Sequence, residues 1–170
     1  MTLHLFSKIF HHLFGSSNFD LPLLENLITP NTCLNILEIG CGSGRLVEKY
    51  AIYTDKKFEL IDIDKEMIST TQKKINELGC NNVTAKYGSG TCIPYADNSF
   101  DLVVIPMLGI EEIVPIFGVI AETFRVLKPN GLLYFSTENP NRLNTKCTGI
   151  FNFNENFNDG TISLELVKNR

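Results

Sequence analysis

The stretch "EIGCGSGR", residues 38–45, decides the fold of this chain. Three glycines fall at alternate positions, Gly40, Gly42 and Gly44, and an acid, Glu38, stands two residues before the first. The apolar run that ends at this stretch predicts a strand, and the residues after it predict a helix. Glycines between a strand and a helix let the backbone turn sharply and let a ligand come close. The stretch therefore predicts a ligand-binding turn at one edge of a sheet.

Strand and helix patterns alternate on both sides of this loop. The predicted strands are "CLNILEI" (33–39), "FELIDI" (58–63), "NVTAKY" (82–87), "SFDLVVIP" (99–106) and "GLLYFST" (131–137). The last of them follows a turn expected at "KPNG", residues 128–131. The first predicted helix starts at Asp20 and stops before Pro30. The others cover 44–53, 64–79 and 113–128, and Gly79 is expected to close the second of these three. Strands that alternate with helices form βαβ units, so we expect an α/β fold with a mostly parallel sheet and helices on both faces.

The two ends of the chain differ from this core, which is expected at 20–140. Residues 1–19 contain the run "MTLHLFSKIFHHLFG", which predicts an amphipathic cap helix packed on the domain. A membrane-surface helix is the alternative, although the run offers only one Lys. Residues 141–170 are expected to form an Asn-rich loop and then a final strand, "TISLELVK", at 161–168.

Composition excludes several classes of function. The 170 residues are 44% hydrophobic with a net charge of -4, which favours one globular domain and gives no reason to expect nucleic-acid binding. The five cysteines have no CxxC spacing, so free thiols in a reducing compartment, and hence a cytoplasmic protein, are expected. All three histidines lie in the first dozen residues without partners at ligand spacing, so no metal site is expected.

The spacing of the loop glycines argues against two common phosphate-binding motifs. A phosphate-binding NTPase loop needs Lys and then Ser or Thr after its last glycine, but Arg45 follows Gly44. The dinucleotide fingerprint G-x-G-x-x-G would need a glycine where Arg45 stands. A turn with a purely structural role also remains open for this stretch.

Two acids indicate what the loop can hold. Glu38 would repel a pyrophosphate but attract an amine, and Asp62 ends the predicted strand 58–63, where an acid can accept hydrogen bonds from ribose hydroxyls. Asp62 could instead cap the following helix, but Asp64 is better placed for that role. A ribose near Asp62 together with an amine near Glu38 matches the parts of S-adenosylmethionine.

Four segments resemble the class I S-adenosylmethionine-dependent methyltransferases, in particular the ubiquinone/menaquinone and small-molecule methyltransferases. These segments are "ILEIGCGSGRLVEKY", "ELIDIDKEMI", "YADNSFDLVV" and "ETFRVLKPNGLLYFSTENPNR", which together cover about residues 34 to 142. The resemblance implies a Rossmann-like, doubly wound sheet. The family sheet normally closes with two further strands, and only "TISLELVK" is available here, so the C-terminal strands are expected to be abbreviated. The resemblance also implies in-line transfer of a methyl group to a small-molecule acceptor.

The resemblance implies a cofactor site as well. The residues expected to line it are Glu38, Gly40, Cys41, Gly42, Gly44, Asp62, Ile63, Ser89, Gly90 and Ile105. Glu38 would meet the amino group of the cofactor and Asp62 its ribose, while Ile63 would pack on the adenine face. Ser89 and Gly90 would lie at the adenine edge, where the family often has an acid at the position of Ser89.

Catalytic residues are not assigned by the resemblance, and three weak candidates remain. His11 and His12 would cover the cofactor if the first helix folds over it, but two adjacent histidines can equally be solvated. Glu111 follows the predicted strand 99–106 at the same edge as the glycine loop, but it can equally be an acid in the first turn of the next helix.

Two other functions stay open. A binding scaffold or partner subunit without catalysis is the alternative, since Ser89 departs from the family pattern and the C-terminus is short. The short C-terminus also suggests a homodimer or a partner chain at an unpaired sheet edge. A nicotinamide-dependent oxidoreductase is opposed by Glu38 and Arg45.

Overall fold

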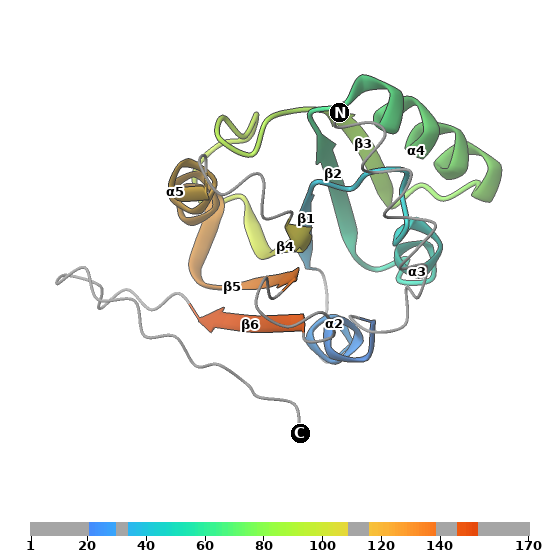
Figure 1. Cartoon of the computed structure of the whole chain (residues 1–170). Helices are drawn as coiled ribbons and strands as arrows, with labels where there is room; N and C mark the ends of the chain where they lie inside the picture. The colour runs from blue at the N-terminus through green and yellow to red at the C-terminus, as the bar shows by residue number, and fades with distance from the viewer. Residues whose placement is uncertain (1–20, 30–33, 109–115, 139–145, 153–170) are drawn as a thin grey trace, which may run out of the picture.

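A computed structural model describes residues 21–29, 34–108, 116–138 and 146–152 (Figure 1). The elements along the chain are α2 (Leu21–Ile28), β1 (Asn35–Ile39), α3 (Val47–Ala51), β2 (Lys57–Asp62), α4 (Lys65–Leu78), β3 (Val83–Tyr87), β4 (Phe100–Leu108), α5 (Ile116–Val126), β5 (Leu127–Glu138) and β6 (Lys146–Asn152). No helix among these residues is both long enough and apolar enough to cross a membrane.

The described strands form one sheet in the order β3-β2-β1-β4-β5-β6. The first five strands of this order run parallel to one another, and β6 runs antiparallel to β5. The predicted Rossmann-like α/β fold is therefore confirmed. Because β1 lies between β2 and β4, the direction in which strands are added reverses beside β1, and ligands bind open α/β sheets at such a point.

Helices cover both faces of the sheet, with α2, α3 and α4 on one face and α5 on the other (Figure 1). The core under the three helices includes Leu24, Ile36, Tyr50, Phe58, Leu60 and Ile68. The core under α5 includes Leu37, Ile61, Val103, Ile105, Val119 and Val126. Alternate residues of β1 and β2 enter opposite cores, as expected for strands buried on both faces.

Local signals fix the ends of α4. The Asp64 side chain accepts hydrogen bonds from the backbone of Glu66 and Met67, and Gly79 ends the helix with a left-handed φ of 62°. The roles predicted for both residues are confirmed. By contrast, α3 is much shorter than the helix predicted over 44–53, because the glycine loop occupies the first part of that range.

The region after α5 differs from the sequence-based expectation in two ways. The turn expected at "KPNG" lies inside β5, where the pairing with β4 skips from Leu127 to Leu132 and Asn130 has a φ of 62°. The loop expected from residue 141 onward contains β6, so that interpretation was wrong for Lys146–Asn152. β6 thus occupies the place beside β5. The predicted cap helix at 1–19 and the predicted strand at 161–168 lie outside the described residues.

Candidate functional site

The glycine loop lies at the carboxyl edge of the parallel strands, between β1 and α3. The backbone N–H groups of Gly40 and Cys41 both donate to the carbonyl of Ile61 in β2, at 2.9 and 3.2 Å. Gly40, Gly42 and Gly44 have φ values of 77°, 55° and 74°, so the backbone is left-handed at all three. The loop therefore passes across the end of β2, beside Asp62.

Glu38 is an acid in the core of the protein. Its side chain is 2% exposed and lies on the sheet face covered by α3, whose Tyr50 stacks on Phe58 with ring centroids 4.2 Å apart. Burial raises the pKa of Glu38 to about 7; the Tyr50 hydroxyl and the charge of Arg45 oppose this rise, and the charge of Asp62 adds to it.

One oxygen of this carboxyl group lacks a partner. Glu38 Oε2 and the Tyr50 hydroxyl make no hydrogen bond of normal geometry with any residue that the structure describes, although the two groups are close enough to affect each other's pKa. Buried polar atoms are seldom left without a partner. A ligand that presents a donor, above all a cationic one, would satisfy Glu38 Oε2.

Asp62 holds the glycine loop in addition to its expected role. One carboxylate oxygen accepts a hydrogen bond from Gly42 N and the other from Asp64 N, both at 2.8 Å. The side chain is half-buried, and each oxygen has a second lone pair. Asp62 can therefore keep the loop in place and still accept hydrogen bonds from a ligand.

Two side chains of helix α4 also hold the glycine loop in place. The Thr71 hydroxyl, which is fully buried, donates to the carbonyl of Gly42 at 2.8 Å, and Lys74 Nζ donates to the carbonyl of Gly44 at 3.1 Å. A Cβ at Gly44 would lie 3.0 Å from the Thr71 side chain and 3.0 Å from Val47, so a larger residue would require these side chains to shift. A Cβ at Gly42 would meet no described atom within 4 Å, so this side of the loop is open.

The other expected site residues lie at different depths. Ile63, directly after β2, is 56% exposed, whereas Cys41 and Ile105 are buried. Burial raises the pKa of the Cys41 thiol, which therefore stays neutral. Ile105 lies within its strand, because β4 continues to Leu108, and its side chain belongs to the core under α5.

The segment after β3 carries the remaining two residues. Ser89 Oγ is 2.9 Å from Thr91 Oγ1 and accepts a hydrogen bond from Thr91 N at 3.2 Å, so the hydroxyl is used within its own turn. A Cβ at Gly90 would lie 3.1 Å from Ile39 at the end of β1 and 3.2 Å from Val119 of α5. These contacts bring Gly90 next to the start of the glycine loop.

The weak catalytic candidates His11, His12 and Glu111 lie outside the described residues. Thr71 and Lys74, in contrast, contact the glycine loop and were missed by the sequence analysis. One signal could have found Thr71. Thr71 lies at helical spacing from Ile68 and Ile75, so the pattern places it on the buried face of α4. A hydroxyl on a buried face needs a hydrogen-bond partner.

The parallel sheet and the glycine loop are typical of one class of protein, and a match to a protein-family model identifies that class. A model described as "Methyltransferase domain" matches residues 36–131, which include the glycine loop, Asp62 and the segment after β3. The match covers more than half of the chain. The chain belongs to this methyltransferase domain family.

Individual relatives agree with this assignment. A demethylmenaquinone methyltransferase of Listeria welshimeri is 30% identical over 110 residues, which are 63% of this chain and 46% of that protein. The chain spans about half the length of the curated relatives it matches.

Two solved structures share the fold. A SAM dependent methyltransferase from Aquifex aeolicus superposes with a TM-score of 0.64 at 22% identity, over 80% of this chain and 76% of that one. A phosphoethanolamine N-methyltransferase of Haemonchus contortus, solved in complex with S-adenosyl-L-methionine, gives a TM-score of 0.65 at 22% identity, over 72% of this chain and 28% of that one. At this identity the two structures support the fold alone.

Proposed function

We propose that this chain binds S-adenosylmethionine and transfers its methyl group to a small-molecule acceptor. The observation that carries the proposal is the buried carboxyl group of Glu38, whose Oε2 lacks a partner among the described residues. It lies two residues before a glycine loop that is open on one side at Gly42. A ligand with an ammonium group suits this acid, whereas a pyrophosphate does not.

Different residues of the chain bind different parts of the cofactor. Glu38 accepts a hydrogen bond from the ammonium group, and the second lone pairs of Asp62 accept from the ribose hydroxyls. The exposed side chain of Ile63 offers an apolar surface to the base. S-adenosylmethionine supplies a methyl group made electrophilic by its sulfonium. The remaining task of the protein is to orient the acceptor and exclude water, because proximity and orientation contribute much of such a rate.

The acceptor is proposed only as a class, a small molecule. Quinone-type compounds come first in a screen, because curated relatives of this chain are demethylmenaquinone methyltransferases. Glu111, His11 and His12 remain proposals for a general base, which is needed only if the acceptor must lose a proton early. A cytoplasmic location likewise remains an expectation, consistent with the free thiols of Cys41, Cys80 and Cys92 among the described residues.

The test is calorimetric titration of the purified chain with S-adenosylhomocysteine, with NAD in parallel. Micromolar binding of S-adenosylhomocysteine without binding of NAD is the expected result. Transfer of a labelled methyl group from S-adenosylmethionine to the acceptor panel then tests turnover. Binding of NAD alone, or binding of neither compound, would overturn the proposal.

A second candidate is a protein that binds the cofactor without turnover. It is favoured by the Ser89 hydroxyl, which is engaged by Thr91 and offers less to an adenine amino group than a free acid would. Binding of S-adenosylhomocysteine without methyl transfer to any acceptor of the panel would favour this candidate.

A further inference from the structure

The segment that joins β3 to β4, residues 88–99, follows α5 along its length. Near the start of α5, a Cβ at Gly118 would lie 3.2 Å from the Thr91 side chain. At its end, Asn98 N and Ser99 N donate to the carbonyls of Arg125 and Val126, at 3.0 and 2.8 Å. Helix α5 therefore supports the whole segment, including the turn that begins at Ser89.

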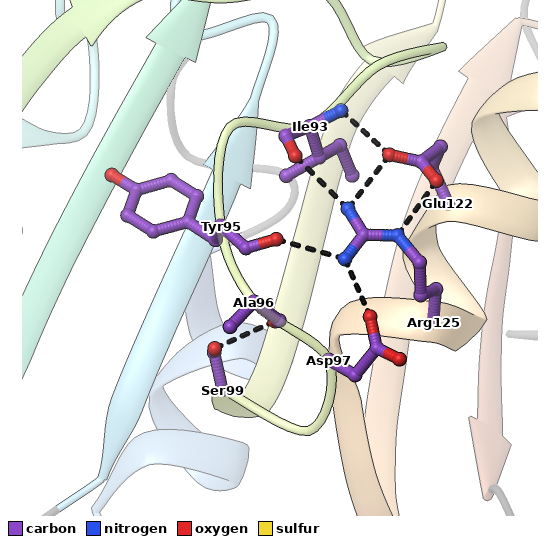
Figure 2. A network of polar contacts seen from close by, with 7 residues as sticks. All are labelled: Ile93, Tyr95, Ala96, Asp97, Ser99, Glu122 and Arg125. Atoms are coloured by element: carbon purple, nitrogen blue, oxygen red, sulfur yellow. Dashed lines mark hydrogen bonds and ion pairs between the residues drawn. The ribbon is translucent and has the colours of Figure 1, made fainter.

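A network of polar contacts joins the middle of this segment to α5 (Figure 2). Arg125 donates to the carbonyls of Ile93 and Tyr95 at 2.9 and 2.8 Å, and to the Asp97 carboxylate at 2.8 Å. It also donates to both oxygens of Glu122, at 2.7 and 2.8 Å. Glu122 in turn accepts a hydrogen bond from Ile93 N at 2.7 Å. We call these five residues the Arg125 network.

The guanidinium group is fully used in this network. Its five N–H donors match the five hydrogen bonds that it makes. Lysine has only three donors and no planar fork, so it cannot reproduce the arrangement. Ile93 is held at both its N–H and its carbonyl, which fixes the two peptide groups on either side of Ile93 against α5.

The network fixes the chain close to the expected adenine edge. Cys92, next to Ile93, donates from its backbone N–H to the Ser89 carbonyl at 3.1 Å, which closes the turn 89–92. Gly90, inside that turn, fits between Ile39 and Val119 with room for no larger residue unless these side chains shift. A shift of Ile93 would therefore move Ser89 and Gly90 relative to the glycine loop.

The ion pairs in the network add little stability of their own. The Arg125 side chain is 31% exposed and the Asp97 side chain 69%, and exposed pairs typically contribute at most about 1 kcal/mol. What the network provides instead is a defined backbone geometry, because its carbonyl and N–H partners can be met in only one arrangement of the segment.

We propose that Arg125, oriented by Glu122, is a positioning residue that places Ser89 and Gly90 for the adenine end of the bound cofactor. This inference rests on the proposed function. It adds a specific claim, namely that recognition of the adenine amino group depends on a side chain of α5 that does not touch the cofactor.

The experiment compares Arg125→Met with a matched control, Lys128→Met. Lys128 makes a similar half-exposed ion pair with both oxygens of Asp101, at 2.9 and 3.0 Å, but at the amino ends of β4 and β5. Each variant is titrated with S-adenosylhomocysteine and with S-inosylhomocysteine, in which an oxygen replaces the adenine amino group. Hydrogen exchange of the Ile93, Asn98 and Ser99 amides is measured in the same samples.

Arg125→Met is expected to weaken binding of S-adenosylhomocysteine roughly tenfold, because small misplacements of binding groups are costly. The ratio of affinities for the two ligands should fall toward one, and the three amides should exchange faster. Lys128→Met should leave affinity and ratio within about twofold of wild type, because its ion pair lies at the amino ends of β4 and β5, at the opposite edge of the sheet from the glycine loop. Arg125→Lys should restore only part of the loss.

The inference is overturned if Arg125→Met keeps both the affinity and the ratio of the wild-type protein, even if the amides exchange faster. If Arg125→Met does not fold, Glu122→Gln, which keeps the shape of the side chain, takes its place with the same expected fall in the ratio. Failure of the wild-type protein to bind S-adenosylhomocysteine would overturn the proposed function, and this inference with it. The wild-type titration therefore distinguishes the two failures.

Discussion

The carboxylate of Asp62 at the end of β2 accepts a 2.8 Å hydrogen bond from the backbone N–H of Gly42 in the loop after β1. The residue expected to bind the ribose is thus also part of the support for the glycine loop. Two neighbouring parallel strands are joined at their carboxyl ends by this contact. A ligand that binds Asp62 would meet a loop whose position is already set.

Replacing Asp62 by Ala should therefore reduce both stability and affinity. It removes two hydrogen bonds to a charged group, and we expect a loss of about 1–3 kcal/mol in the free energy of unfolding. Affinity for S-adenosylhomocysteine should fall by a similar free energy. Asp64→Ala is the control, because it removes the cap of α4 but keeps the Asp62 carboxylate, and it should lower stability alone. Unchanged affinity in Asp62→Ala would mean that the ribose is misplaced.

The Thr71 hydroxyl offers a second test of the loop support. Thr71→Val keeps the shape of the side chain but leaves the Gly42 carbonyl without its donor, which should cost about 1–3 kcal/mol of stability. Thr71→Ser keeps the donor and should cost less. Urea unfolding measures both variants. Equal stability of the Val variant and the wild-type protein would show that the hydroxyl does not support the loop.

Gly44 and Gly79 form a matched pair for measuring steric crowding. Both have left-handed backbones, with φ of 74° and 62°, but a Cβ would clash at 3.0 Å at Gly44 and meet no described atom within 4 Å at Gly79. Gly79→Ala should cost about 1–2 kcal/mol for its backbone alone. Gly44→Ala should cost clearly more, as measured by thermal or urea unfolding. Equal losses would mean that α4 moves away freely from the loop.

Glu38 makes stability depend on pH. Its pKa rises from 4.5 to about 7 on folding, so between these values the folded chain binds more protons than the unfolded chain. Stability of the unliganded protein should therefore fall as pH rises through this window, by up to about 3 kcal/mol in total. Glu38→Gln should remove this component and be the more stable form at about pH 8. Unfolding curves for the two forms that stay parallel across the window would contradict this expectation.

The same acid should make ligand binding depend on pH in the opposite direction. An ammonium group favours the charged carboxylate, so binding below about pH 7 must release the proton of Glu38. Affinity for S-adenosylhomocysteine should rise from acidic pH toward neutral pH, with proton release detectable by calorimetry in buffers of different ionisation heat. Glu38→Gln should bind weakly and lack this rise. A wild-type affinity that is constant over the window would argue against contact between Glu38 and the ammonium group.

Much of the fold could be predicted from local patterns. The five parallel strands and the ends of α4 follow from apolar runs, Asp64 and Gly79. β6 could not, because "KCTGIFN" alternates weakly and contains Gly149, and its pairing with β5 is a tertiary contact. The length of α3 was also overestimated, since a helical pattern does not reveal how many residues a preceding turn requires.

The sequence pattern indicated the residues that we expect to contact a ligand, but not the residues that support them. The glycines, Glu38 and Asp62 carry a recognisable pattern, but Thr71 lies in a helix whose sequence looks ordinary. Arg125 is similar, since its spacing to Glu122 suggests only a surface ion pair. Its two backbone carbonyl partners come from a segment about 30 residues away and depend on the folded chain.

The hydrogen bonds from Arg125 to main-chain groups determine which sequence changes the segment 88–99 can accept in evolution. Because its contacts with Ile93 and Tyr95 are to backbone atoms, most side chains between Gly90 and Ser99 can be exchanged without loss of the contact. Inserting or deleting a single residue there would instead shift every following partner along α5. The segment should therefore accept many point changes among homologous chains while its length stays constant.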